Sequence, residues 1–288
     1  MSLPGTDRLL LTRAVEALAA LPDGTREWLA INHQGGINRI YAGQGIDQGM
    51  LIVQRRAAPI PGVDFRRERR ILALVRHYSW APRLLAADNG SATLLFPRYA
   101  VTTADAPASC LLRLLGDLQG LTAAPALDYG GLPGAYATRL RHRAGAVTLC
   151  GMLARELERL PAQPACLVHH DLHPGNVLVL AHAGLAPAIK VIDWENAGRG
   201  SPWLDMAAAA RHWRIGGSDF RGLPATRGMS CRAIRNALAS AAGINELLTR
   251  LWQMLVARQA GTEGPRSMLC GGSEAGAWPL PGNPRHMD

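Results

Sequence analysis

Three oxygen-bearing side chains in residues 166–195 have the types and spacing that phosphoryl transfer from a nucleotide requires. Asp171 and Asn176 share the short segment HHDLHPGN, and Asp193 follows a second apolar run at 189–192. One carboxylate can orient and deprotonate an attacking hydroxyl, while Mg²⁺ takes carboxylate, amide and phosphate oxygens as ligands. These residues therefore predict a general base and two metal ligands in one site.

The elements around these residues must bring them together. Residues 177–180 and 189–192 are apolar runs separated by a loop, which is the pattern of a β-hairpin. Pairing of the two runs brings Asn176 and Asp193 to the same end of the hairpin. A helix is expected soon afterwards, because Trp203, Met206 and Ala210 recur at helical spacing.

The amino-acid sequence of this region resembles that of a known group of enzymes. H-x-D-L-x-x-x-N is the catalytic-loop pattern of protein kinases. HHDLHPGNVLV followed by VIDWENAGRGSPWLDMA resembles the aminoglycoside phosphotransferase and choline/thiamine kinase group, where HGDLHPGN and IDWE-x-AG-x-G-x-P-x-x-D are usual. The resemblance implies a two-lobed, protein-kinase-like α+β fold with a small β-rich N-lobe and a larger, mostly helical C-lobe.

The resemblance also implies roles for individual residues. Asp171 would be the catalytic base, and Asn176 and Asp193 would hold Mg²⁺ beside ATP. His169 and Asp205 would support the catalytic loop from behind.

His170 departs from the glycine that is usual in the group. The candidates for the acceptor pocket are Trp194, Glu195 and Trp203, together with the aromatic side chains of Trp213 and Trp252. Tryptophan faces can bind a thiazolium or quaternary ammonium ion, although tryptophans at such positions also serve as core residues.

The N-terminal part has features of a nucleotide-covering lobe. Short β-type runs at 28–33, 37–43 and 50–54 are separated by glycine-rich turns. Gly35 and Gly36 are candidates for nucleotide contact, because bare backbone can approach phosphates closely. Their segment GGINRIY also resembles the GG-x-T-N-x-x-Y of choline-type kinases.

A cation and a carboxylate complete this lobe. Lys190 is the only lysine in the chain, so Arg55, at the end of the third run, is the candidate for holding the phosphates of ATP. Arg56 is the alternative, because strand register decides which side chain points inward. Residues 63–78 read as a helix that carries Glu68 on its apolar face, where pairing with Arg55 would satisfy the carboxylate.

The chain divides into two expected lobes and a tail. Residues 1–99 form the nucleotide-binding lobe, which begins with a helix at 8–21 and ends with a strand at 93–99. Residues 100–260 form the catalytic and acceptor-binding lobe. Residues 261–288 are rich in Gly and Pro without periodicity, which is typical of a disordered tail.

Composition restricts the class of protein. The 288 residues carry a formal charge of +9, yet the arginines are scattered and no aromatic-interleaved motif accompanies them, which disfavours a nucleic-acid-binding protein. Lys190 lies in an apolar strand, so a Walker A loop is excluded. Five widely spaced cysteines and the lack of a long apolar stretch predict a cytoplasmic protein with no membrane segment.

Alternatives to a kinase remain. His169, His170, Asp171 and His173 resemble the zinc cluster of a metal-dependent hydrolase, although adjacent ligands rarely converge on one ion. A catalytically silent, nucleotide-binding pseudokinase is the other alternative, and the intact set of Asp171, Asn176 and Asp193 argues against it.

The acceptor is expected to be a small hydroxylated metabolite, with thiamine or choline/ethanolamine favoured over an aminoglycoside or amino sugar. From Gly200 onward the chain has six acidic residues against ten arginines, whereas a polycationic drug needs several acidic groups.

Overall fold

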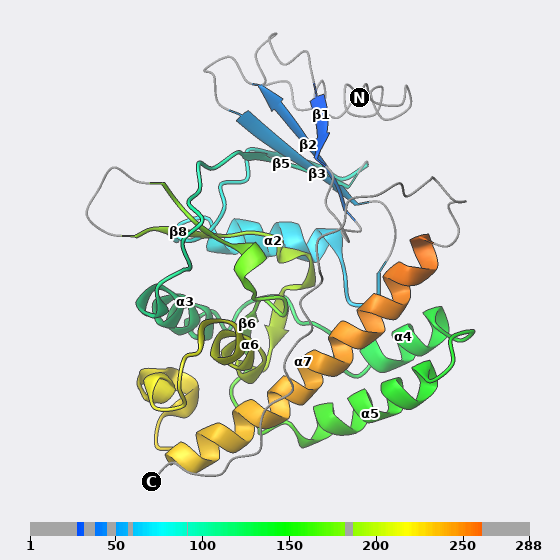
Figure 1. Cartoon of the computed structure of the whole chain (residues 1–288), viewed down its shortest axis with the longest axis vertical. Coiled ribbons are helices and arrows are strands. Elements are labelled where there is room, and N and C mark those ends of the chain that lie inside the picture. The colour runs from blue at the N-terminus through cyan, green and yellow to red at the C-terminus, as the bar shows by residue number, and fades with distance from the viewer. Residues whose placement is uncertain are drawn as a thin grey trace.

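A computed structural model describes residues 28–31, 38–44, 50–56, 60–90, 92–181 and 187–260. Its first part is an antiparallel five-stranded sheet in the order β1-β2-β3-β5-β4 (Figure 1). The strands are β1 (Trp28–Ile31), β2 (Asn38–Gln44), β3 (Met50–Arg56), β4 (Ala86–Asp88) and β5 (Thr93–Pro97). The strands expected at 28–33, 37–43, 50–54 and 93–99 correspond to β1, β2, β3 and β5. The expected helix at 8–21 and the tail 261–288 lie outside the described residues.

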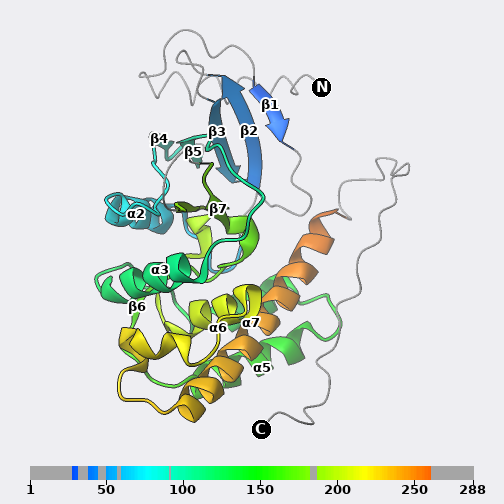
Figure 2. The same cartoon turned by 60° about the vertical axis from the view of Figure 1, so that its left-hand side comes forward.

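Helix α2 (Phe65–Val75) lies between the sheet and the helical part of the molecule (Figures 1 and 2). It begins after Asp64, whose side chain accepts hydrogen bonds from the amides of Arg66 and Arg67, an arrangement that satisfies free amides of the first turn. Its buried face consists of Glu68, Ile71, Leu72 and Val75. The one carboxylate on this face is therefore held in an apolar setting, as the helical spacing predicted.

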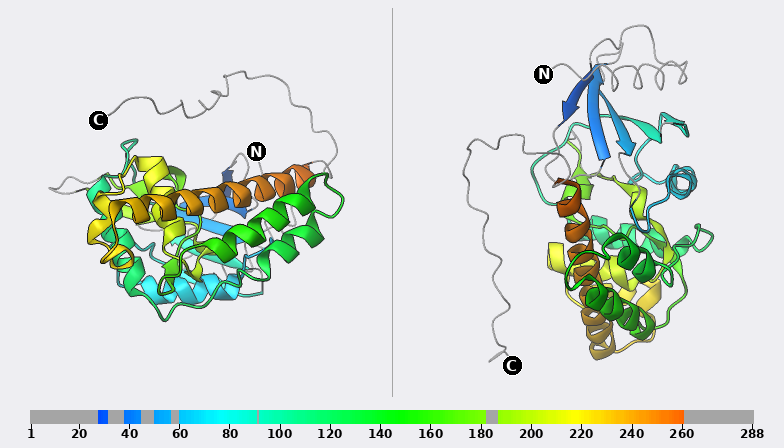
Figure 3. Two further views of the ribbon diagram at one scale, coloured as in Figure 1. Left: turned by 90° about the horizontal axis from the view of Figure 1, so that it is seen from below. Right: turned by 90° about the vertical axis from the view of Figure 1, so that its right-hand side faces the viewer.

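The second part is mainly helical. Its helices are α3 (Ala108–Gly120), α4 (Leu132–Arg139), α5 (Ala146–Arg159), α6 (Trp203–Trp213) and α7 (Cys231–Ala260). Helix α7 runs alongside α5 (Figure 3). Its buried positions recur every three or four residues: Ile234, Ala237, Ala241, Ile244, Leu247, Leu251 and Leu255. One face of α7 is thus committed to the core. Among the described helices, none combines the length and apolarity that a bilayer span requires.

Two short ribbons connect the helices to the centre of the molecule. β7 (Val177–Val179) pairs antiparallel with β8 (Ile189–Val191), which confirms the predicted hairpin. β6 (Cys166–Val168) pairs with β9 (Gly198–Gly200), a ribbon that the sequence patterns did not predict. The second ribbon brings the start of the HHDLHPGN segment beside the end of the IDWENAG segment.

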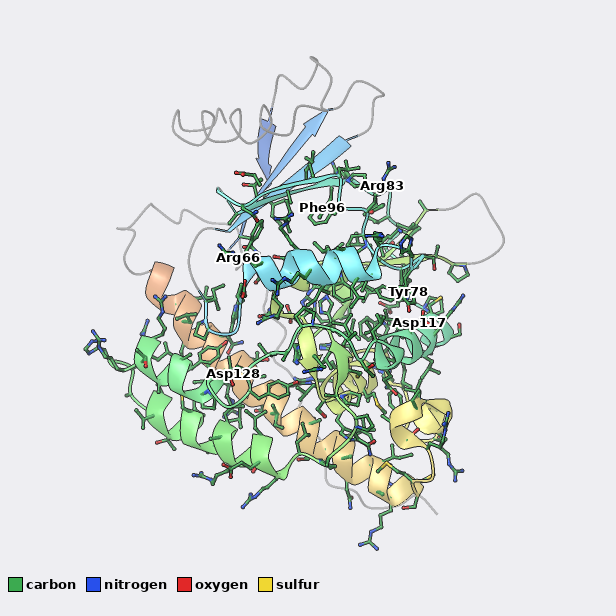
Figure 4. The ribbon with its side chains drawn as sticks, turned by 180° about the vertical axis from the view of Figure 1, so that it is seen from behind. Arg66, Tyr78, Arg83, Phe96, Asp117 and Asp128 are labelled. Atoms are coloured by element: carbon green, nitrogen blue, oxygen red, sulfur yellow. The ribbon has the colours of Figure 1, made fainter. Side chains whose placement is uncertain are left out.

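Lys190 fastens the β7–β8 hairpin to the loop after α2. Its Nζ donates to the carbonyls of Ser79 and Ala81, each at 2.8 Å. Between these residues, Trp80 donates from Nε1 to Asp117 of α3 at 2.8 Å and stacks on Trp194 with ring centroids 5.7 Å apart. Figure 4 shows Asp117 beside Tyr78 at this junction of α2 and α3. The lone lysine is therefore a structural link between two segments.

Candidate active site

The loop that follows β6 is held from behind by a buried carboxylate. Asp205, in the first turn of α6, accepts from the His169 amide at 2.7 Å and from the His170 amide at 3.0 Å. Burial raises the pKa of Asp205 to about 7, and these two amide hydrogen bonds lower it. Asp205 thus fixes the backbone of the two residues that precede Asp171.

Asp171 and Asn176 face each other across this loop. Asn176 Nδ2 donates to the main-chain carbonyl of Asp171 at 2.9 Å and to Asp171 Oδ2 at 3.2 Å. His173 Nε2 lies 3.7 Å from Asp171 Oδ1, and both side chains are about 40% exposed (41% and 42%), so this pair adds little stability. The carboxylate of Asp171 is consequently oriented by Asn176 while remaining open to solvent and substrate.

Asp193 follows β8 in a strained conformation. Its φ and ψ are both 63°, in the left-handed region that few residues other than glycine adopt. The preceding residue is fixed at both polar groups: the Ile192 amide donates to the Asn176 carbonyl, and the Ile192 carbonyl accepts from His169 Nε2, each at 2.9 Å. Burial lowers the pKa of His169 to about 4, which keeps the ring neutral with its proton on Nε2. Asp193 and Asn176 therefore share one end of the β7–β8 hairpin.

His170 also has a positive φ, of 66°, which gives a physical reason why glycine is usual at this position. Its Nε2 lies 2.6 Å from the Tyr129 hydroxyl, and that hydroxyl accepts from the Ser201 amide at 3.2 Å. Burial lowers the pKa of His170 to about 3, so the ring is neutral. Its Nε2 therefore accepts a hydrogen bond from the Tyr129 hydroxyl. A Cβ at Gly200 would lie 2.0 Å from the Tyr129 hydroxyl, so this close approach needs glycine there.

Helix α2 reaches the segment after Asp193 through an arginine. Arg67 Nε donates to the Ala197 carbonyl at 2.7 Å, and Nη2 donates to the carbonyls of Gly62 and of Glu195, the latter at 3.4 Å. The neighbouring Glu68 is 1% exposed and borders the cavity described below. Arg67 was not singled out from the sequence, because the run of arginines at 66–70 gives no sign of which one turns inward.

Parts of the predicted nucleotide site fall outside what the structure describes. The backbone of Arg55 pairs with Thr93 of β5 and with Arg39 of β2, but the side chains of Arg55 and Arg56 are outside the described part. Gly35 and Gly36 also lie outside the described residues. The pairing of Arg55 with Glu68 and the phosphate-covering loop stay predictions.

The three acceptor-pocket candidates have different surroundings. Glu195 is 6% exposed, and its Oε2 accepts a hydrogen bond of 2.6 Å from Asn38 Nδ2 at the start of β2. Trp194 is almost fully buried and donates from Nε1 to the Val191 carbonyl, but an edge of it borders the cavity. Trp203 is completely buried in the core and is absent from the described cavity lining.

A cavity of about 960 Å³ brings the other groups together. Its floor, as we use the term, consists of the lining residues within 170–176 and 192–196, including Asp171, Asn176 and Asp193. Phe96, which lies between the sheet and α2 in Figure 4, borders it from the sheet side. Four carboxylates border the cavity: Glu68, Asp171, Asp193 and Glu195.

The far wall of the cavity is formed by α4, α6 and α7. Its residues are Leu132, Tyr136, Ala207, Ala208, Arg211, His212, Ala242, Asn245, Leu248, Thr249, Trp252 and Gln253. No Asp or Glu is among these described wall residues, whereas Tyr136 and Trp252 are aromatic. Burial, with smaller contributions from the nearby Cys150, Asp171 and Glu195, raises the pKa of Tyr136 to about 12, so its hydroxyl stays protonated near the Asp171 carboxylate.

The donor set of the floor suits a hard cation. Asp193 and Asn176 offer oxygen ligands, and Mg²⁺ is commonly held by one or two protein carboxylates plus substrate phosphates. In the described ranges no group of three or more His, Cys, Asp or Glu side chains could hold a metal unaided. His169 and His170 use their Nε2 atoms for Ile192 and Tyr129, which leaves neither of these nitrogens for a zinc ion.

Several residues of this site were not predicted from the sequence. Asn38 belongs to the GGINRIY segment, in which only Gly35 and Gly36 were given a role from the sequence. Tyr129 and Tyr136 lie in a stretch without a motif, and their inward position depends on α4 and on the β6–β9 ribbon.

Comparisons with known proteins agree on the type of fold. A profile described as a phosphotransferase enzyme family matches residues 28–244. No curated protein sequence matches the chain.

Solved structures are similar over most of their length. Choline kinase LicA from Streptococcus pneumoniae aligns with a TM-score of 0.64 and 15% identity, over 88% of this chain and 92% of that chain. A choline/ethanolamine kinase family protein from Mesorhizobium loti aligns with a TM-score of 0.60 and 17% identity, over 90% and 89%. A macrolide 2'-phosphotransferase type I gives 0.60 and 15%, over 91% and 98%. A second LicA structure contains AMP. At these identities the similarity shows a shared protein-kinase-like α+β fold.

Proposed function

Because the chain belongs to this phosphotransferase enzyme family, we propose that it is a Mg²⁺- and ATP-dependent kinase that phosphorylates a hydroxyl of a small metabolite. The observation that carries the proposal is the floor of the cavity. There Asn176 orients the Asp171 carboxylate, and the β7–β8 hairpin brings Asp193 beside Asn176. A base and two oxygen ligands at the floor of one cavity are the parts that phosphoryl transfer requires.

In this mechanism Asp171 accepts the proton of the acceptor hydroxyl as the hydroxyl oxygen attacks the γ-phosphorus of ATP. The bond between that phosphorus and the β,γ-bridging oxygen breaks, and ADP leaves. Asn176 keeps the carboxylate turned toward the cavity through the 3.2 Å hydrogen bond. Asp193 and the Asn176 amide oxygen would hold Mg²⁺, which would supply positive charge to neutralise the charge that develops on the phosphates. Asp205 and His169 act through the loop backbone and through Ile192, so they are positioning residues.

The nucleotide occupies the sheet side of the cavity in this proposal. Ile40, Phe96 and Leu178 supply apolar surface there for a base, and the described main chain at 97–99 borders the same region. The AMP-containing structure of LicA supports a nucleotide site in this fold. Arg55 and Glu68 would complete the site, with Arg55 on the phosphates.

The acceptor side of the proposal is choline, ethanolamine or thiamine. Tyr136 and Trp252 on the far wall, with Tyr129 beside the floor, offer aromatic faces to a single quaternary or heteroaromatic cation. A polycationic aminoglycoside is the second candidate, and the lack of carboxylates among the described wall residues disfavours it. Arg211 on α6 adds positive charge, which disfavours a polycation further, whereas burial lowers the pKa of the neighbouring His212 and favours its neutral form.

An acceptor panel tests the proposal. The protein is incubated with labelled ATP or GTP and Mg²⁺, together with choline, ethanolamine, thiamine, neutral sugars or kanamycin, and phosphorylated products are separated. We expect transfer to one of the small alcohols. Nucleotide binding without transfer to any acceptor would favour a pseudokinase, and activity that depends on zinc would favour the hydrolase.

A further inference from the structure

The segment immediately after Asp193 is contacted by two different elements of the sheet lobe. From β2, Asn38 Nδ2 donates to Glu195 Oε2 at 2.6 Å. From α2, Arg67 donates to the carbonyls of Glu195 and Ala197. Glu195 is therefore bonded through its side chain to one element and through its main chain to another.

These contacts join positions far apart in the sequence at the edge of the active site. Asn38 lies 157 residues before Glu195 and, in the sequence, two residues after Gly36, a candidate for contact with the phosphates. Glu195 lies two residues after the strained Asp193. A rotation of the sheet away from the floor must break the Asn38–Glu195 hydrogen bond, because its two partners move apart.

We propose that Asn38 and Glu195 form a latch between the lobes that keeps Asp193 in its left-handed conformation while the sheet is closed over the nucleotide. Glu195 is then a positioning residue for the metal site and not an acceptor-pocket residue. This inference rests on the proposed kinase function. Surrounding structure must over-determine a left-handed aspartate if it is to persist, and the hydrogen bonds of Ile192 fix the residue that precedes Asp193. The latch and Arg67 fix the segment that follows it.

The acceptor-pocket role for Glu195 is the competing explanation. Its carboxylate would then recognise a cationic acceptor, and its loss would raise the KM for that acceptor. In the latch, loss of the contact raises the KM for ATP and weakens the response to Mg²⁺, while the KM for the acceptor stays the same. The two explanations thus predict changes in different kinetic constants.

A polarity swap provides the experiment. Asn38→Asp brings a second carboxylate against Glu195 in place of the amide donor, at a position where Asn38 Oδ1 is already buried without a hydrogen-bond partner among the described residues. Glu195→Gln keeps an oxygen that can accept from Asn38, so its effect should be small. In Asn38→Asp/Glu195→Gln the glutamine amide donates to the aspartate, which restores the hydrogen bond with reversed polarity.

We expect Asn38→Asp to lower kcat/KM for ATP by about 10- to 100-fold and the double variant to recover most of that loss, as for strongly coupled neighbours. Glu195→Gln should change it by about threefold or less. The exposed residues Asn236 and Glu158 supply matched controls, Asn236→Asp and Glu158→Gln, which should resemble the wild type. A double variant no better than Asn38→Asp, or an acceptor KM that rises in Glu195→Gln, would overturn the latch.

Hydrogen exchange separates this inference from the kinase proposal. In the nucleotide-free protein, Asn38→Asp should speed amide exchange in peptides covering β2 and residues 192–197, and the double variant should return it to the wild-type rate. This readout needs no turnover. If the wild type phosphorylates no acceptor but the exchange pattern appears, the latch stands and the proposed function fails. Unchanged exchange in Asn38→Asp overturns the latch itself.

Discussion

The floor and the far wall of the cavity are held by different interactions. Floor residues are fixed by buried hydrogen bonds to the main chain, such as those of Asp205 to the His169 and His170 amides. The far wall consists of side chains on three helices, and many of them are apolar or aromatic. A site fixed by backbone geometry tolerates few substitutions, whereas a helix surface can exchange side chains without moving. The chemistry should therefore depend on the floor and the choice of acceptor on the wall.

Substitution of the proposed base, Asp171, is the sharpest test of this contrast between the floor and the far wall. Asp171→Asn retains the shape of the side chain and its contact with Asn176 but cannot take a proton. Turnover should fall by about 10²–10⁴-fold, the usual loss for a general base, while nucleotide still binds. Steady-state kinetics with a titration of unreactive nucleotide measures both effects. Near-normal turnover would show that the floor does not carry the chemistry.

Removal of a metal ligand should have the next largest effect. Asp193→Ala and Asn176→Ala each remove an oxygen donor, so we expect activity to fall by about 10- to 1,000-fold and the Mg²⁺ requirement to rise. A Mg²⁺ titration for each variant measures this change. If the wild type keeps its activity in the presence of a Mg²⁺ chelator, the assignment of both ligands is wrong.

Substitutions on the sheet side of the cavity should have a smaller effect on activity. Arg55→Ala should raise the KM for ATP and lower kcat, by about 10-fold each, while Arg56→Ala should change little. Glu68→Gln should give a milder version of the Arg55 defect, with a double variant that is less than additive because the two act as a unit. A double-mutant cycle in kcat/KM measures the coupling. Strict additivity, or a larger loss at Arg56, would show that the other arginine contacts the phosphates.

Substitutions in the far wall should change a different kinetic constant, the KM for the acceptor. Trp252→Ala removes an aromatic face from α7, so the KM for the acceptor should rise by about 5- to 30-fold while the KM for ATP stays within about twofold. Tyr136→Phe tests the hydroxyl that lies near Asp171 and should raise the same constant by a smaller factor. Equal changes in both Michaelis constants would mean that the wall and the floor are not separable.

The smallest effect concerns stability and His170. In the folded protein the pKa of His170 is lowered to about 3, whereas in the unfolded chain it is about 6.5. Between about pH 3 and pH 6.5 the unfolded chain binds a proton at His170 that the folded protein does not bind. The free energy of unfolding therefore falls as the pH is lowered below about 6.5. Between pH 7 and pH 5 this amounts to about 1–2 kcal/mol.

His170→Gly removes the titrating ring and, with it, this pH-dependent loss of stability. Glycine also adopts the positive φ without strain, although the Tyr129 hydroxyl loses its hydrogen-bond acceptor. Urea denaturation at pH 7 and pH 5 should show a smaller difference for His170→Gly than for the wild type. His142→Gly, at an exposed histidine, is the matched control and should reproduce the wild-type difference. An unchanged pH dependence in His170→Gly would mean that the ring is not held neutral.

The hairpin and the residues of the floor could be predicted from the sequence because they are local, whereas the α+β kinase-like fold was implied by the family resemblance. Asp171 and Asn176 share one loop, and apolar runs on each side of residues 181–188 specify the ribbon that brings Asp193 to them. Glu68 was predicted on the apolar face of its helix because helical spacing alone determines which residues share a face.

Long-range contacts were not predictable in the same way. The hydrogen bond between Asn38 and Glu195 depends on how two lobes dock, and nothing local in either segment indicates it. Trp203, predicted as a pocket residue, is fully buried, because aromatic residues at helical spacing fit a core and a pocket equally well. The role of Tyr129 required both the β6–β9 ribbon and a glycine at position 200 to let it approach His170.

Helix α7 carries two stripes of residues that serve separate purposes. Ile234, Ala241 and Leu251 belong to the stripe that is packed in the core, while Asn245 and Trp252 belong to the one that borders the cavity. Four positions of the second stripe also support the core, because Ala242, Leu248 and Trp252 pack against it and Asn245 donates to the Leu204 carbonyl. Thr249 and Gln253 are exposed and border the cavity. A library randomised at these two positions would therefore sample new acceptors with the least effect on the core, and the same two positions give natural variation a route to new substrates.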